Sequence, residues 1–131
     1  MIERIEFNDE LYALIIRNEF DNEGIKFFTP PDYSQQLAYM KHSTGHIIQP
    51  HLHNDVKREV FKTLEVLFIK KGKLKVDFYT KQKTHFTTKV LTSGDVILLI
   101  QGGHGFKVLE EVIMIEVKQG PFLGEQDKVR F

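Results

Sequence analysis

Short segments rich in β-branched and aromatic residues recur along most of this chain, and turn-forming residues separate them. The segments lie at 11–20, 24–29, 36–42, 45–53, 63–71, 73–80, 84–91, 95–100, 104–110 and 111–118. Their spacing of roughly 8 to 12 residues predicts an all-β sandwich or barrel. Leu74, Val76 and Phe78 alternate with polar residues, so we expect them on one face of a strand. Some helical spacing occurs at 56–64, and glycine-containing turns are expected at 70–73 and 92–95.

The length and charge of the chain restrict its class of function. With 131 residues and no linker or repeat, it is expected to form one domain over 1–131. Its 18 basic and 18 acidic residues balance, which disfavours nucleic-acid binding. Its apolar runs are far shorter than the roughly 20 residues of a membrane-spanning helix, and its acidic start is unlike a secretory signal. We therefore expect a cytoplasmic protein with neither nucleic acid nor membrane as a partner.

Four of the six histidines, His42, His46, His51 and His53, crowd into a short stretch. In a strand, His51 and His53 would share a face and could offer two nitrogens to one metal ion. The alternative is that both belong to a solvated loop after Pro50. The chain has no cysteine, so a metal site would have to use imidazole, carboxylate or water.

A carboxylate and a distant histidine follow the histidine pair. Glu65 begins the next strand-like segment, and His104 comes after the apolar stretch 95–100 and a glycine pair. Together with His51 and His53 they resemble a three-histidine, one-carboxylate site with open coordination positions. The alternative for His104 is a histidine that only hydrogen-bonds inside the barrel.

These residues resemble the two motifs of the cupin superfamily. Gly45, His51, His53, Glu65 and Gly72 match the first motif in order, although 11 residues separate His53 from Glu65, so 54–64 is expected to form an enlarged loop. Part of the second motif is matched by Gly94, Gly102 and His104, with a bulge expected at the glycine pair. The resemblance implies a double-stranded β-helix, or jelly-roll barrel, with its core at about 36–118, N-terminal strands at 1–35 and a tail at 119–131.

The cupin resemblance implies a divalent metal, of which manganese, iron, nickel and zinc all suit these ligands. The implied function is action on a small organic or carbohydrate substrate, as in metal-dependent isomerases or oxygenases. A looser similarity links the chain to WxcM-like sugar-nucleotide cupins, through the His51/His53 pair and the Asp127-x-x-Arg130 end. It implies a metal-free ketoisomerase or epimerase in which His51 and His53 transfer protons to a sugar nucleotide. A non-catalytic ligand-binding cupin is the third alternative.

The remaining features support secondary expectations. His42, His46 and His85 are expected on the surface, and Glu59 in the enlarged loop. Lys118 or Arg130 is a candidate for binding an anionic substrate. By resemblance to small cupins we expect a homodimer, with the apolar segment 11–20 buried against a partner or against its own barrel.

Overall fold

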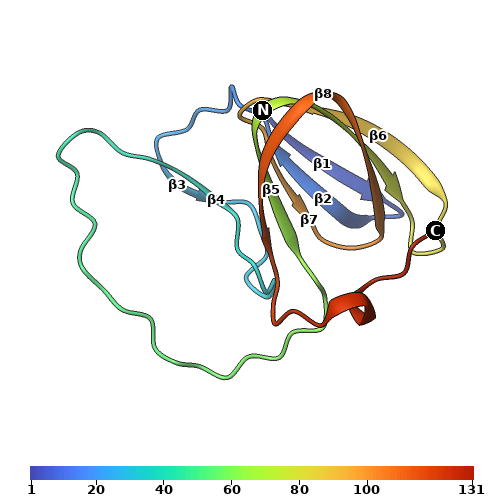
Figure 1. Cartoon of the computed structure of the whole chain (residues 1–131). Helices are drawn as coiled ribbons and strands as arrows, with labels where there is room; N and C mark the ends of the chain where they lie inside the picture. Colours follow the sequence, from blue (N-terminus) through green and yellow to red (C-terminus); the bar gives the residue numbers. More distant parts are fainter.

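The structure is a computed structural model that describes residues 1–131, and it is all-β, as the sequence predicts. Its regular elements are eight strands and one short 3-10 helix (Figure 1). They are β1 (Ile2–Phe7), β2 (Glu10–Ile16), β3 (Gly24–Phe27), β4 (Ala38–Lys41), β5 (Glu65–Tyr79), β6 (His85–Thr92), β7 (Val96–Leu99), β8 (Gly103–Lys118) and η1 (Gly124–Asp127). It contains no helix of the length and apolarity needed to cross a membrane.

Six strands form one antiparallel sheet in the order β1-β2-β7-β5-β6, and β8 also pairs with β5. The first part of β5 pairs with β7 and the second part with β6, while β8 runs beside both parts. The sheet therefore curls into a half-barrel (Figure 1). Strands β3 and β4 pair only with each other, outside this sheet.

The bend of β5 is centred on Gly72, whose φ is +94°. Its backbone lies so close to the carbonyl group of Glu111 on β8 that a Cβ atom would overlap it. The register between β5 and β8 shifts between Ile69 and Leu74. The turn expected at 70–73 is thus wrong: the strand continues through Gly72 because β8 offers pairing partners on both sides of the bend.

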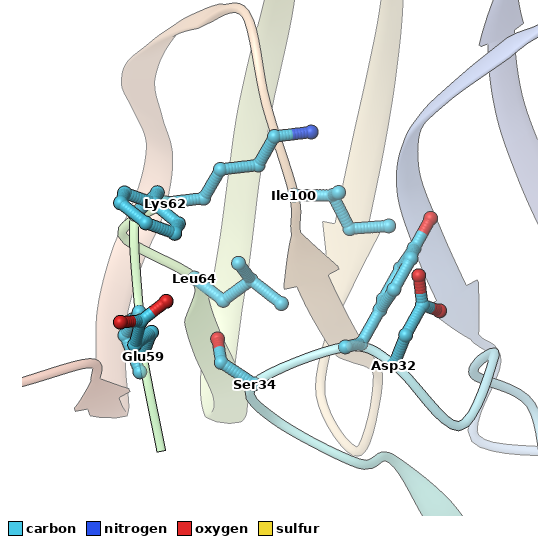
Figure 2. A pocket seen from close by; sticks show the side chains of 9 residues that line it. Asp32, Ser34, Glu59, Lys62, Leu64 and Ile100 are labelled. Atoms are coloured by element: carbon cyan, nitrogen blue, oxygen red, sulfur yellow. The ribbon is translucent and has the colours of Figure 1, made fainter.

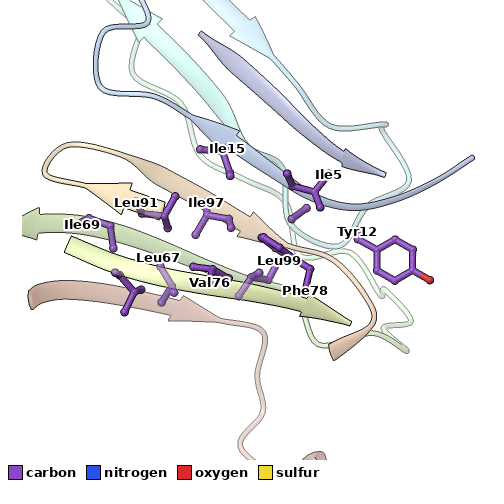
Figure 3. Close-up of a cluster of buried hydrophobic side chains, with 12 residues drawn as sticks. Ile5, Tyr12, Ile15, Leu67, Ile69, Val76, Phe78, Leu91, Ile97 and Leu99 are labelled. Carbon is purple, nitrogen blue, oxygen red and sulfur yellow. The ribbon is translucent and has the colours of Figure 1, made fainter. Parts of the chain in front are cut away.

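The predicted alternation in β5 is confirmed, since Leu74, Val76 and Phe78 are all buried. They belong to the main core cluster on the concave side of the curled sheet (Figure 3). Its other members are Ile5, Tyr12, Ala13, Ile15, Leu67, Ile69, Leu91, Ile97 and Leu99. A second cluster, Leu11, Leu14, Leu64, Leu98 and Ile100, covers the opposite face of β2 and β7. Residues 11–16 of β2 and all of β7 are free of charged side chains, as expected for strands whose two faces are both covered.

The largest departure from the predicted strands is in residues 43–62, which we call the exposed segment. It forms no strand or helix, and every residue in it is exposed. The strand expected at 45–53 and the helical turn at 56–64 are therefore absent, whereas the enlarged loop expected at 54–64 is confirmed. Figure 1 shows this segment as a wide arc that leaves β4 and returns to β5 away from the half-barrel. A strand requires a hydrogen-bonding neighbour, and this chain places none beside the arc.

Candidate functional site

Glu65 and His104 meet on the concave side of the half-barrel. Glu65 is the first residue of β5, and His104 is the second residue of β8. The register places His104 opposite Phe78, near the far end of β5, so the curl of the sheet brings the two ends of that strand together. His104 Nε2 lies 3.3 Å from Glu65 Oε2.

The turn before β8 aims the His104 side chain inward. Gly102 has a φ of +74°, and its backbone packs against the ring of Tyr12 and the carbonyl group of Tyr79. Residues that face each other across antiparallel strands project to the same side of the sheet. His104 therefore shares the concave side with the buried Phe78 opposite it. Gly102 thus has the positive φ that glycine allows, but the bulge expected at the glycine pair is absent, because the register from Gly103 to Val108 opposite Tyr79 to Leu74 is unshifted.

The site is partly shielded from water, with 18% of the Glu65 side chain and 29% of the His104 side chain exposed. The imidazole of His104 holds the pKa of the Glu65 carboxyl below its ordinary value, against the opposing effect of burial. Positive charge on Lys118 and Lys128 acts in the same direction. Glu65 is therefore a carboxylate at neutral pH.

An apolar wall continues from the Glu65–His104 pair along β8. The ring of Phe106 lies beside that of His104, with 5.2 Å between their centroids. Phe106 and Val108 face Val76 and Leu74 across the sheet, so both project to the concave side. Both are about half exposed, which leaves a surface that can contact an apolar or ring-shaped ligand.

His51 and His53 do not reach this pair within the chain. Both lie in the exposed segment, with their rings 5.3 Å apart and nearly perpendicular. His51 Nδ1 is 2.8 Å from the backbone carbonyl oxygen of Gln49, a contact local to the loop. No group of three or more histidine, aspartate or glutamate side chains is positioned to hold a metal ion. The structure brings together two of the four predicted ligands, Glu65 and His104.

The other histidines lie apart from the site. His85 is half exposed beside Thr88 on β6, as expected for a surface residue. His42 and His46 stack in parallel, with their centroids 4.1 Å apart. His42 is half-buried rather than fully on the surface, and its buried Nε2 has no hydrogen-bond partner.

The charged residues considered for anion binding also have defined positions. Lys118 lies opposite Glu65 in the register of β5 and β8, so it borders the candidate site, and its Nζ lies 3.6 Å from Glu116 Oε1. Arg130 instead forms an ion pair with Glu125 in the exposed tail. Of the two candidates for anion binding, Lys118 is the one beside the Glu65–His104 pair.

A pocket of about 230 Å³, which sequence reasoning did not identify, lies between the turn at 32–34 and the end of the exposed segment at 59–62 (Figure 2). Leu64 and Ile100 form part of its wall, and Asp32, Ser34 and Lys62 supply polar groups. Neither Glu65 nor His104 lines it. It joins residues that are distant in the chain and belong to no motif, so no local pattern could predict it.

Comparison with known proteins gave no match to a family model, to a curated protein or to a solved structure.

The chemistry of the Glu65–His104 pair suits two uses. An ionised carboxylate and an imidazole are both ligands for manganese, iron, nickel or zinc, and their donor atoms face each other here. The same carboxylate can also orient the imidazole as a proton-transfer group. The first use requires further ligands, whereas the second requires only the residues already in contact.

Proposed function

We propose that this chain is a small cupin with a jelly-roll barrel that binds a divalent metal through Glu65, His104, His51 and His53. The contact between Glu65 and His104 is the observation that carries the proposal. These residues are far apart in the sequence, yet both project to the concave side of the sheet beside the core. Ion pairs that serve no site are usually fully exposed, whereas the Glu65 and His104 side chains are mostly shielded from water.

The residues around the pair favour a small organic or carbohydrate-type substrate. Phe106 and Val108 offer an apolar wall, and Lys118 offers a positive charge beside Glu65. A bound metal would polarise a carbonyl group or activate a coordinated molecule. The chain's own residues would orient the substrate, with its apolar part against Phe106 and a hydroxyl or carboxylate toward Lys118.

A second candidate function is metal-free isomerisation of a sugar nucleotide. It is favoured by the fact that the Glu65–His104 pair has no third metal-ligating side chain beside it in the chain. In this alternative His104, oriented by Glu65, transfers the proton, a role that the resemblance to WxcM-like cupins gives to His51 and His53. The two functions differ in whether added metal binds at Glu65.

Calorimetric titration with zinc, manganese, iron(II) and nickel tests the metal proposal. We expect the parent protein to bind at least one of these metals saturably. The affinity should fall more than about 100-fold in Glu65→Gln and His104→Ala, because replacing residues that only hydrogen-bond to a metal ligand already lowers metal affinity by roughly 10- to 100-fold. Glu10→Gln and His85→Ala are matched controls, because these residues are about half exposed on β2 and β6 and lie outside the candidate site. Equal affinity in Glu65→Gln and the parent would refute the site. Failure of the parent to bind any of the metals would favour the metal-free isomerase.

A further inference from the structure

The exposed segment 43–62 is apolar enough to need a partner. Chains that stay disordered have few large apolar residues, because they cannot recover the entropy of ordering by burial. This segment instead carries six of them at 41% to 91% exposure. They are Ile47, Ile48, Leu52, Val56, Val60 and Phe61.

Both ends of the exposed segment are anchored by contacts outside the main core cluster. At the start, Lys41 on β4 forms ion pairs with Asp21 and Glu23, in the part of the chain around β3 and β4. At the end, Thr63 donates a hydrogen bond to Asp127, and Leu64 is buried in the second core cluster. Between these anchors the segment arcs outward (Figure 1).

The free edge of β8 is the surface that matches this segment. Strand β8 pairs with β5 along one edge and with no strand along the other, over Gly103–Lys118. A long apolar edge strand is a template for pairing with another chain. Seven large apolar residues on it are between 37% and 58% exposed. They are Phe106, Val108, Leu109, Ile113, Met114, Ile115 and Val117.

The exposed segment also carries basic residues and a histidine pattern that suit a strand added beside β8. Glu110 and Glu111 on β8 are exposed and pair with Lys73 and Lys71 of β5, so Lys57 and Arg58 of an added segment would share carboxylates that already have one lysine each. A strand added at the free edge of β8 would place side chains about 5 Å from those of β8, His104 included. Alternate residues of such a strand share a face, so the histidines of the His-x-His pair would point the same way.

We propose that two copies of this chain form a two-fold dimer in which each lays its exposed segment along the free edge of the other's β8. His51 and His53 of one copy then join Glu65 and His104 of the other, so that each metal site is shared between subunits. Every copy carries both surfaces, which allows the exchange to close as a symmetric dimer. The strand predicted at 45–53 would form in this dimer, where it gains the neighbour that the single chain lacks. The metal part of this inference rests on the proposed function, whereas the association does not.

Complementation between two variants tests the shared site. One chain carries His51→Ala and His53→Ala, the other carries Glu65→Gln and His104→Ala, and the heterodimer is isolated through two removable tags without histidine. We expect the parent dimer to bind two zinc ions, each variant homodimer none, and the heterodimer one, because one of its two sites combines intact halves. A heterodimer without zinc, beside a parent that binds it, would mean that each chain completes its own site and would overturn the sharing.

Sedimentation measurements test the association without metal. We expect a dimer at micromolar concentration, with dimerisation weakened more than tenfold by Leu52→Asp or Phe61→Asp. Phe122→Asp is the control, because Phe122 is equally exposed but lies outside both surfaces. A monomeric parent, or a dimer that neither segment variant weakens, would overturn the inference. If the parent protein dimerises as described but binds no zinc, the proposed metal-binding function is wrong and the exchange of segments is still supported.

Discussion

At the scale of single residues, Asp95 connects the N-terminal strands to the rest of the sheet. It is 1% exposed, and its carboxylate accepts hydrogen bonds from the backbone N–H groups of Asn18 and Thr92 and from the Arg17 guanidinium. Arg17 in turn pairs with Glu3 on β1. The network holds the end of β2 against the turn between β6 and β7.

Replacement of Asp95 by alanine is expected to lower the free energy of unfolding by about 3 kcal/mol. The change leaves a half-buried arginine with one fewer partner and two backbone N–H groups without an acceptor. Glu10→Ala is the control, because Glu10 is 50% exposed in a surface ion pair with Lys81, and it should change stability by less than about 1 kcal/mol. Urea unfolding measures both. Equal losses in the two variants would show that the Asp95 network contributes no more than a surface pair.

The pairing of Glu3 with Arg17 predicts a dependence of stability on acid. Its hydrogen bond with Arg17 holds the pKa of Glu3 below its ordinary value of 4.5. A depressed pKa contributes stability that is complete above the ordinary value and is lost as the pH falls through the folded-state value. The free energy of unfolding should therefore fall between about pH 5 and pH 3, and less steeply in Glu3→Gln. Parallel urea-unfolding profiles for the two proteins would contradict this assignment.

The site residues show how far single positions could be predicted. Glu65 and His104 were identified because a carboxylate and a histidine occur at motif-like spacings, and the structure places them in contact. The network around Asp95 was not foreseen, because its partners Asn18 and Thr92 contribute backbone groups that no residue type reveals. Side-chain chemistry can be inferred from a sequence more readily than backbone contacts between distant turns.

At the scale of elements, the bend of β5 at Gly72 creates the site, because it turns one strand back toward itself. Gly72→Ala is expected to destabilise the protein by roughly 2–4 kcal/mol, since alanine is strained at this φ and its Cβ would overlap the carbonyl group of Glu111. Gly24→Ala is a matched control, with a φ of +80° and open space around it. It should cost only about 1 kcal/mol. Thermal and urea unfolding of both variants checks the difference, and similar losses would show that contact with β8 is unimportant.

The strands that could be predicted differ from those that could not in where their partners lie. The buried runs of β2, β5 and β7 were recognised from apolar content and alternation, and they are central strands. Strand β1 lies within the N-terminal strands expected at 1–35, but its bounds could not be assigned because the sequence IERIEF is rich in charge and its hairpin depends on positive φ at Asn8 and Asp9. The strand expected at 45–53 has the right residues but no neighbour in the chain. Local composition indicates a preference for strand, and the fold decides whether a partner exists.

At the scale of the whole molecule, one side of the half-barrel is covered by further strands, whereas the edge formed by β8 has no neighbouring strand. The β1–β2 hairpin and β7 cover the core, whereas β8 leaves an edge and an apolar surface free. The same chain carries an apolar arc with two of the four expected ligands. A motif read along a sequence lists ligands in order, but it does not specify which copy of the chain supplies each of them.

The most direct test of the central claim is the metal content of untagged protein purified without added metal, measured by elemental analysis beside Glu65→Gln and Glu10→Gln. We expect a stoichiometric divalent metal in the parent and in Glu10→Gln, and loss of most of it in Glu65→Gln while the protein remains folded. Metal retained at the parent level in Glu65→Gln, or a metal-free parent that fails to take up added manganese, iron, nickel or zinc, would contradict the account.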